Sequence, residues 1–278
     1  MIAARPPTPA VAANVRRNAR ASWDRPVRWK GARDALWDLL DPLLAHGGRV
    51  AVVGAGNADD VPLTRLAARA AEVHLIDLDR AAARAAIRRE PRALRRRLSA
   101  LEQDVTAGAA DRIVTAALSA GREERVHVPE DAIGTGSYDL VVGDLLYTQL
   151  LFPALLDAGI APQRRARVLQ THGQPLTDAV VRRLHAAAPA GFVVHVHDVA
   201  GWWPGRTQPL SIDEVLEGLP DPSRLVHRLV RPGGCDPEVS LRRAGVRADE
   251  RRWWRWPFSD GVTYLVQALV SRPRTGGR

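Results

Sequence analysis

Two patterns of apolar residues alternate along the first two thirds of the chain. Short runs such as RVAVVG and VHLID end in Gly or Asp and are typical of buried strands. Between them, apolar residues recur at helical spacing, as Leu36, Leu40 and Leu43 do. Strands are predicted to end near residues 54, 77, 104, 144 and 199, and helices to cover 29–45, 62–71, 80–90, 109–118, 148–158 and 175–189. This repeat indicates a parallel, doubly wound α/β sheet with helices on both faces.

The last third of the chain follows a different pattern. Short helical segments near 212–219 and 237–244 precede two strands, 250–256 and 261–271, which are joined by a short turn. Strands that are joined so closely pair in the antiparallel sense. We therefore expect a mostly parallel sheet that is completed by an antiparallel C-terminal hairpin, an uncommon arrangement.

The composition is that of a globular protein with an excess of basic residues. The 278 residues include 40 Lys and Arg against 31 Asp and Glu, a net charge of +9, and 46% are hydrophobic. This is enough to form a full core. The basic excess lies in residues 1–33 and 242–278, around a mildly acidic body. It indicates solvated basic arms, a basic rim that attracts an anionic substrate, or nucleic-acid binding.

Two rare residue types exclude several kinds of site. Cys235 is the only cysteine, which excludes intrachain disulfides, iron–sulfur clusters and cysteine-based zinc sites, and we expect no metal. Lys30 is the only lysine, and no Gly-Lys-Ser or Gly-Lys-Thr triplet occurs, which excludes a Walker A loop.

No segment has the pattern of a membrane span or a secretion signal. The most apolar stretch, residues 140–162, contains Asp144 and Asp157, which are too costly in a bilayer core. Prolines occupy positions 6, 7 and 9, where a signal peptide would have an apolar run. We expect a cytoplasmic protein with a basic N-terminal arm over 1–31, of which 1–15 is mobile, a main domain over 32–271 and a flexible tail over 272–278.

The glycine loop after the first strand restricts the kind of ligand. VAVVGAGNADD contains Gly54 and Gly56 but has Asp59 where a dinucleotide fingerprint needs a third glycine. A carboxylate at that position is unfavourable beside a pyrophosphate. A ligand without phosphate, which carries a carboxylate, an ammonium group and an adenosine, fits better. The alternative is that the glycines only turn a strand into a helix.

Two aspartates follow the next two strands. Asp77 ends the second strand, where a carboxylate can accept hydrogen bonds from both ribose hydroxyls. Asp104 ends the third strand, where a carboxylate can accept the amino group of adenine. Either acid alone could be a helix cap. Because the carboxyl ends of adjacent parallel strands share one edge, the order Gly54, Asp77, Asp104 predicts a ligand site there.

The segments VAVVGAGNADD, VHLIDLD, LEQDVT and YDLVVGDLLYTQL, followed by the closing hairpin, resemble the class I S-adenosylmethionine-dependent methyltransferases. The resemblance covers 32–271, most clearly 48–150, and is to a bacterial subgroup without an assigned substrate. It implies a Rossmann-like, seven-stranded sheet with its last strand antiparallel, a helical N-terminal extension, and S-adenosyl-L-methionine as cofactor. In this family the glycine loop holds the methionine part, the acid after the second strand holds the ribose, and the acid after the third contacts adenine. The implied cofactor-binding residues are Gly54, Ala55, Gly56, Asn57, Asp77, Leu78, Asp104, Val105 and Gly143.

The sequence departs from the family pattern at two positions. Val52 stands where the family usually has an acid near the methionine amino group, and Ala58 stands where it usually has a third glycine. Asp59 or Asp60 could replace the missing carboxylate. No Asn-Pro-Pro-Tyr motif follows the fourth strand, which argues against methylation of amide nitrogen and of adenine N6.

Candidates for the methyl-acceptor side come from the loops after the fourth and fifth strands and from the N-terminal segment. Methyl transfer is an in-line displacement, so the enzyme aligns the nucleophile and removes its proton. The candidate catalytic residues are Asp144, Tyr147 and His172. The candidate substrate-binding residues are Trp29, Asp198, Trp202, Trp203 and Arg206. His195 and His197 are interpreted as partly buried strand histidines.

Three functions are compatible with these residues. The favoured one is a methyltransferase that acts on a small-molecule acceptor, as a monomer or homodimer. The alternatives are an RNA methyltransferase that uses the basic arms and an inactive protein that only binds S-adenosylmethionine. We expect residues 16–31 to form part of a lid over the ligand, and removal of residues 1–15 to have little effect.

Overall fold

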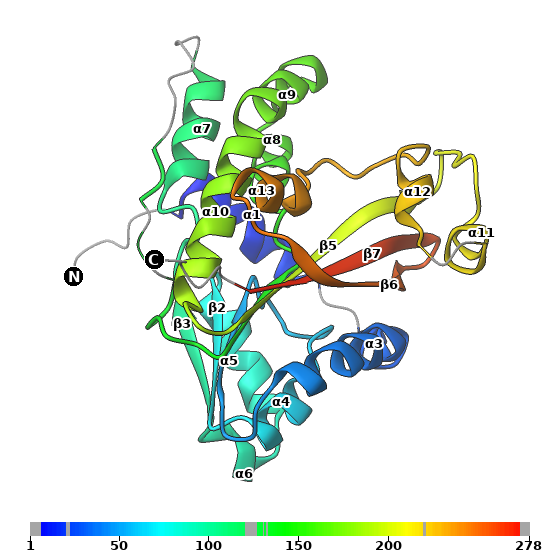
Figure 1. Cartoon of the computed structure of the whole chain (residues 1–278). Coiled ribbons are helices and arrows are strands. Elements are labelled where there is room, and N and C mark those ends of the chain that lie inside the picture. Colours follow the sequence, from blue (N-terminus) through cyan, green and yellow to red (C-terminus); the bar gives the residue numbers. More distant parts are fainter. Residues whose placement is uncertain are drawn as a thin grey trace.

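The computed structural model describes residues 7–20, 23–119, 127–129, 131, 133–218 and 221–272. One seven-stranded sheet with the order β3-β2-β1-β4-β5-β7-β6 runs through its centre (Figure 1). The strands are β1 (Arg49–Val53), β2 (Glu72–Asp77), β3 (Leu98–Glu102), β4 (Leu140–Asp144), β5 (Phe192–Trp202), β6 (Ala248–Ser259) and β7 (Val262–Ser271). Strands β1 to β5 pair in parallel, whereas β7 pairs antiparallel with both β5 and β6. The predicted doubly wound sheet with a closing hairpin is confirmed.

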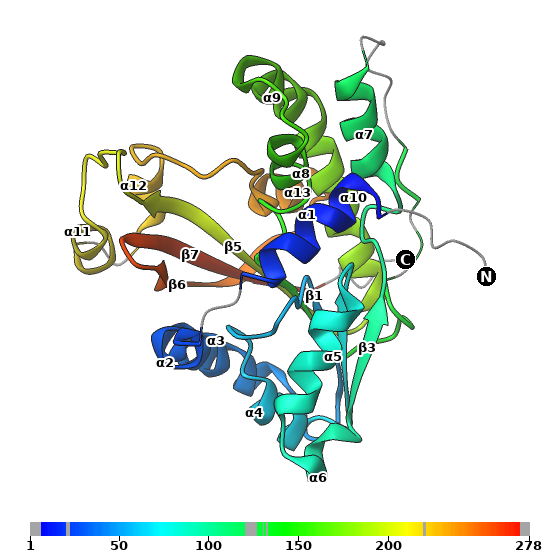
Figure 2. The same cartoon turned by 180° about the vertical axis from the view of Figure 1, so that it is seen from behind.

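Helices cover both faces of the sheet (Figures 1 and 2). One face carries α3 (Lys30–Leu40), α4 (Leu63–Arg69), α5 (Arg80–Arg89) and α6 (Arg92–Arg95). The other carries α1 (Pro9–Asn18), α7 (Ala109–Leu118), α8 (Phe152–Asp157), α9 (Pro162–Val168), α10 (Gln174–Ala187) and α13 (Pro237–Arg243). The short helix α2 (Arg25–Arg28) precedes α3, and α11 (Ile212–Glu217) and α12 (Ser223–Val226) lie beside the hairpin. None of the helices in the described ranges is both long enough and apolar enough to cross a bilayer.

Alternate residues of the central strands supply two separate cores. Val50 and Val52 pack with α3 and α4, whereas Ala51 and Val53 pack with α7 and α10. Side chains alternate between the faces of a strand, so a strand that is covered on both sides needs apolar residues throughout. This explains the uninterrupted run of Val and Ala in β1. A third, smaller core joins the far end of β5 to α11 and α12.

Several elements differ in extent from the sequence prediction. The helix predicted over 29–45 is divided into α3 and a 3₁₀ turn, Asp41–Leu43, because Pro42 cannot continue an α-helix. Helix α8 begins at Phe152 rather than near 148, with Pro153 in its first turn. Strand β5 continues to Trp202, three residues beyond the predicted end, because β7 pairs with it as far as Thr263.

The N-terminal segment corrects the expectation of a mobile arm for residues 9–15, whereas residues 1–6 of that arm lie outside the described residues. Helix α1 packs on the core that contains Ala51 and Val53, through the buried side chains of Ala10 and Ala13. The amide of Ala10 donates a hydrogen bond of 2.8 Å to the carboxylate of Asp111 in α7. At the other end of the chain, the Arg272 guanidinium lies 4.0 Å above the Phe192 ring, and residues 273–278 of the predicted tail lie outside the described residues.

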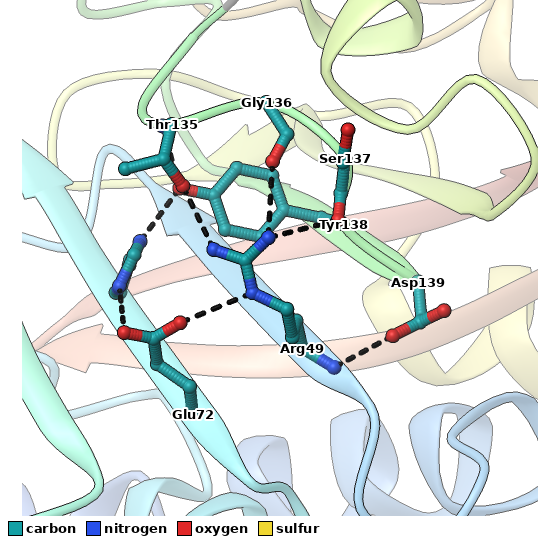
Figure 3. Close-up of polar contacts among 8 residues, drawn as sticks. Arg49, Glu72, Thr135, Gly136, Ser137, Tyr138 and Asp139 are labelled. Carbon is teal, nitrogen blue, oxygen red and sulfur yellow. Dashed lines mark hydrogen bonds and ion pairs between the residues drawn. The ribbon is translucent and has the colours of Figure 1, made fainter.

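A polar cluster ties the loop before β4 to the amino-terminal ends of β1 and β2 (Figure 3). The Arg49 guanidinium donates to Glu72 at 3.1 Å and to the hydroxyl of Thr135 at 2.9 Å. The buried Tyr138 hydroxyl accepts the Thr135 amide at 3.1 Å and lies 2.6 Å from Nδ1 of His74. The cluster therefore fixes the edge of the sheet opposite to the strand ends that carry Gly54 and Asp77.

Tyr138→Phe tests the weight of this cluster. The variant removes the hydroxyl shared by His74 and Thr135 and leaves a buried ring nitrogen without that partner. We expect the free energy of unfolding to fall by about 1–3 kcal/mol in urea titrations. Tyr264→Phe is the matched control, because the Tyr264 hydroxyl makes no hydrogen bond within the described part of the chain. Equal losses in the two variants would contradict the assignment.

Candidate functional site

A cleft of about 500 Å³ opens at the carboxyl ends of the parallel strands. Gly54 follows β1, Asp77 and Asp144 end β2 and β4, and Asp198 lies within β5 just past its last residue paired with β4; all four line the cleft. A narrower pocket of about 90 Å³ adjoins it beside the loop after β3, and the two share Gly54 and Asp77. This is the edge at which open α/β sheets bind their ligands.

The glycine loop approaches its neighbours too closely for side chains. Gly54 has a φ of +83°, and a Cβ there would lie 2.8 Å from the carbonyl oxygen of Asp144. Gly56 has a φ of +47°, and a Cβ there would lie 2.9 Å from Oδ1 of Asn18. The backbone of the loop can therefore come close to a ligand in the cleft.

Asp77 joins the glycine loop to the end of β2. Its carboxylate is buried and accepts hydrogen bonds from the amides of Gly56 at 2.9 Å and Asp79 at 2.8 Å. It also accepts the side-chain amide of Asn14 at 2.5 Å. Burial raises the pKa of this carboxyl, and the three donors oppose that rise. The carboxylate is thus held rigidly at the junction of the cleft and the narrow pocket.

Helix α1 covers this junction. Beside the bond from Asn14 to Asp77, the Asn18 side chain donates to Asp79 at 3.2 Å, and Asn57 donates to the carbonyl of Asn18 at 2.8 Å. At its other side α1 pairs with Asp157 through Arg16 and Arg17. In Figure 2, α1 lies between α8 and the strand ends. Helix α1 therefore forms part of the wall of both the cleft and the narrow pocket.

The loop after β3 forms the wall of the narrow pocket. The Asp104 carboxylate accepts hydrogen bonds from the amides of Thr106 at 2.7 Å and Gly108 at 2.6 Å. It therefore stabilises the turn that follows it. The buried Arg183 of α10 donates to the backbone carbonyls of Val105 and Asp131. Leu78 and Val105 supply apolar walls. The pocket is therefore a preformed, largely apolar slot with Asp104 at its edge.

Two carboxyl groups in the cleft have unusual environments. Burial raises the pKa of Asp144 well above its ordinary range, and the charge of Asp60 adds to the rise. Asp144 is 3% exposed and makes no side-chain hydrogen bond to any described residue. Burial also raises the pKa of Asp60 to about 6, and the neighbouring charge of Asp59 adds to it. Asp59 itself is paired with Arg89 at 2.8 Å and Arg25 at 3.6 Å. Asp60 and Asp144 are therefore suited to receive a cationic ligand group.

Asp198 marks the other end of the cleft. Its Oδ1 accepts the hydroxyl of Thr148 at 3.0 Å, and burial raises its pKa to about 7. A β-bulge after Asp198 shifts the register of β5 against β7, and such bulges re-aim side chains at active sites. The aromatic residues that line the cleft are Trp29, Phe152, Trp256, Phe258 and Tyr264.

The structure brings most of the sequence-predicted site residues together. Those that line the cleft or the narrow pocket are Trp29, Gly54, Ala55, Gly56, Asn57, Asp77, Leu78, Asp104, Val105, Asp144 and Asp198. Gly143 faces the core instead, where a Cβ would meet Leu184 and the Tyr147 hydroxyl. Tyr147 is buried behind the cleft, and its hydroxyl lies 2.5 Å from Nδ1 of His195.

Four further candidates do not border the cleft. His172 is buried in a π-helical turn, Leu169–Gly173, that joins α9 to α10, where we had expected an open loop. Trp202 donates to the carbonyl of Leu210 at 2.9 Å in the third core, and Arg206 is exposed beyond it. Trp203 packs on Gly201 and on the Tyr264 ring at 6.4 Å. Trp202, Trp203 and Arg206 were expected directly after the end of β5, beside the cleft. Because β5 continues to Trp202, they lie farther along the chain than Asp198, the β5 residue that lines the cleft.

Sequence reasoning missed several residues that line the cleft. Asn14 and Asn18 were assigned to arms, although their spacing of one helical turn on a Pro-started helix was a usable signal. Phe258 and Tyr264 were counted only as parts of a hairpin. Trp256, which is buried like Trp254 of the same strand, was likewise not predicted as a site residue.

Comparison of the sequence with protein-family models and with curated proteins finds no match. Comparison with solved structures finds a methyltransferase from Leishmania major that depends on S-adenosylmethionine, 11% identical, with a TM-score of 0.50 over 95% of this chain and 83% of that one. One from Aquifex aeolicus is 12% identical over 94% and 97%, with a TM-score of 0.46. One from Thiobacillus denitrificans, in complex with S-adenosyl-L-homocysteine, is 13% identical over 86% and 91%, with a TM-score of 0.43. The chain has the fold of the S-adenosylmethionine-dependent methyltransferases.

The close approach at Gly54 predicts a graded effect of alanine substitutions. Gly54→Ala should lower the free energy of unfolding by about 2–4 kcal/mol, because a positive φ and a backbone collision add. Gly56→Ala meets only the movable Asn18 side chain. It should cost about 1–2 kcal/mol, as should Gly47→Ala, which has a positive φ in open space. Chemical unfolding of the three variants measures the order, and equal losses would contradict it.

Proposed function

We propose that this protein is a methyltransferase that uses S-adenosylmethionine to methylate a small-molecule acceptor. The observation that carries the proposal is the division of one cleft at the strand ends. An apolar slot beside Asp104 adjoins a wide space with unpaired carboxyl groups, and Asp77, fixed by the amide of Gly56, stands between them. A ligand with a nucleoside at one end and a cationic amino acid at the other has the matching chemistry.

The residues on either side of Asp77 fit the two ends of this cofactor. Leu78 and Val105 can enclose a flat base, and Asp77, which accepts three hydrogen bonds, has about one acceptor site left for a ribose hydroxyl. The amides of Gly54 and Gly56 already donate to Ile76 and Asp77, so these glycines offer the amino-acid end of the cofactor close approach rather than hydrogen bonds. Val52 is fully buried in the core, so the acid that the family usually has there must be replaced. We assign that role to Asp60, with Asp144 beside it.

The cofactor would supply a methyl group bonded to a sulfonium, and this chain's residues would orient the groups that react. The nucleophile must approach from the side opposite to the departing sulfur. Asp144 and Asp198 lie on the adjacent strands β4 and β5 and border the wide part of the cleft, where such an approach is open. The aromatic walls would exclude water from this space. Helix α1 would act as a cover, although it spans residues 9–18 and the lid was expected from residues 16–31.

The contacts of the basic residues favour a small acceptor over RNA. Arg16 and Arg17 pair with Asp157, Arg25 pairs with Asp59, and Arg28 pairs with Asp24 and Asp260. Arginines that are engaged in this way are less available to phosphates. An inactive binding protein would retain the affinity for the cofactor and lack turnover with every acceptor.

Titration calorimetry with S-adenosylmethionine and S-adenosylhomocysteine tests the cofactor. Both should bind, and Asp77→Ala should weaken binding by about 1.5–3 kcal/mol, because hydrogen bonds to a charged carboxylate are lost. Tyr138→Phe, altered at the opposite edge of the sheet, should bind normally. No binding to the wild-type protein, or unchanged affinity in a folded Asp77→Ala variant, would refute the proposal.

The acidic end of the cleft predicts a pH dependence. Asp60 has a raised pKa of about 6 in the free protein, and a nearby cation would lower it. Affinity for S-adenosylmethionine should therefore rise between about pH 5 and 7, by at most about tenfold per pH unit, and level off above the free pKa. Asp60→Asn should flatten this part of the profile. An unchanged profile in that variant would assign the ammonium group to another carboxylate.

A further inference from the structure

The wide part of the cleft has an aromatic wall that does not extend to the narrow pocket. Ring centroids of Trp29 and Trp256 are 5.1 Å apart, those of Trp256 and Phe258 are 5.0 Å apart, and those of Phe258 and Tyr264 are 5.7 Å apart. Phe152 lines the cleft from α8. Such a wall suits a flat or apolar group.

The wall is held in place by the protein itself. The Trp29 indole donates to the carbonyl of Pro257 at 2.9 Å, and the Arg25 guanidinium lies 4.7 Å from the ring centroid. Within the described residues, the buried indole nitrogen of Trp256 has no hydrogen-bond partner. An unsatisfied buried donor costs about 1–3 kcal/mol. The cluster is therefore not arranged for greatest stability, and Phe258 and Tyr264 remain half-buried beside the cleft.

A carboxyl group and a phenol meet at this wall. Tyr264 and Asp198 come from the paired strands β7 and β5, and the charge of Asp198, after burial, contributes to the raised pKa of Tyr264. Oδ1 of Asp198 is engaged by Thr148. Apart from the backbone amide of Asp198 itself, its other oxygen has no hydrogen-bond donor among the described residues. That oxygen can accept a proton or a hydrogen bond from a molecule in the cleft.

The charges of the cleft decide which molecule fits. Four of its carboxyl groups have no ion pair in the described part of the chain: Asp60, Asp77, Asp144 and Asp198. The lining arginines Arg17, Arg25 and Arg28 are paired with other acids, and Arg20 is exposed at the rim. With Asp60, Asp77 and Asp144 assigned to the cofactor, Asp198 is left for the acceptor. A cationic acceptor balances this charge, whereas an anionic one adds to it.

We propose that the acceptor is a small arylalkylamine, an aliphatic amine that carries an aromatic ring and is protonated in solution. Its ammonium group binds Asp198, and its ring packs against Phe258 and Tyr264. This inference rests on the proposed methyltransferase function. Aromatic faces attract ammonium groups as well as rings, so the same wall would hold both parts of such a molecule.

The proposed reaction gives Asp198 a defined part. Its carboxylate takes one proton from the ammonium group, and the freed nitrogen lone pair forms the bond to the methyl carbon. The carbon–sulfur bond breaks and its electron pair stays on sulfur, which becomes a neutral thioether while the product becomes a methylated ammonium ion. Asp198 then releases the proton to water. Its raised pKa of about 7 suits a base that works near neutral pH.

Binding of three probes to the full chain saturated with S-adenosylhomocysteine tests the proposal without turnover. The probes are phenethylamine, phenethyl alcohol and phenylacetate, which differ mainly in charge, and their affinities can be measured by NMR titration. Phenethylamine should bind at least about tenfold more tightly than either of the others, which corresponds to about 1.4 kcal/mol. Equal binding of the three, or a preference for the anion, would overturn the proposal.

Two variants separate the charge from the wall. Asp198→Asn keeps an oxygen for the Thr148 hydroxyl and should remove the preference for phenethylamine while leaving the affinity for phenethyl alcohol unchanged. Phe258→Ala should weaken both probes alike. Asp221→Asn, on a loop outside the cleft, is the matched control. A preference that persists in a folded Asp198→Asn variant would refute the role of Asp198.

The outcomes also separate this inference from the function on which it rests. If S-adenosylhomocysteine binds and the amine preference is absent, the acceptor assignment fails and the methyltransferase assignment stands. If S-adenosylhomocysteine does not bind the wild-type protein, both fail.

Discussion

The arrangement of the cleft depends on the contact between the end of β1 and the end of β4. With Gly54 there is room for the carbonyl of Asp144 to approach, and with any side chain there is not. That contact sets where the glycine loop turns, and the loop in turn holds Asp77 through the amide of Gly56. Leu145, next to Asp144, takes a φ of 48°. Strained residues of this kind persist only where their surroundings impose them.

The distribution of charge in the cleft has a cost for the folded protein. Asp144 is buried without a counter-ion in the described structure, and its raised pKa shows that burial disfavours the charged form. A group of this kind does not stabilise the fold. Asp59, which lines the same cleft, avoids this cost because Arg89 and Arg25 form ion pairs with it. The contrast between these neighbours separates acids that hold the structure together from acids that are open to a ligand.

The features that could be predicted from sequence are those that local patterns determine. The strand ends at Gly54 and Asp77 follow from apolar runs that stop at characteristic residues, and they indicated a parallel, doubly wound sheet. The end of β5 could not be found in this way, because β7, far along the chain, pairs with it up to Trp202. For the same reason Trp202 and Trp203 were placed in the cleft, although Trp203 only supports Tyr264 from behind. A helical N-terminal extension was expected from the resemblance, but the docking of α1 was missed because it depends on distant side chains, such as Asp77 and Asp111.

Arg183 has a consequence for how this protein can diverge. It holds the wall of the narrow pocket by donating to main-chain carbonyls, those of Val105 and Asp131, rather than to side chains. Main-chain atoms are the same for every amino acid. Mutations along that loop can therefore change the lining of the pocket while its path stays fixed, so that related proteins could share the shape of this wall and differ in nearly every residue that forms it.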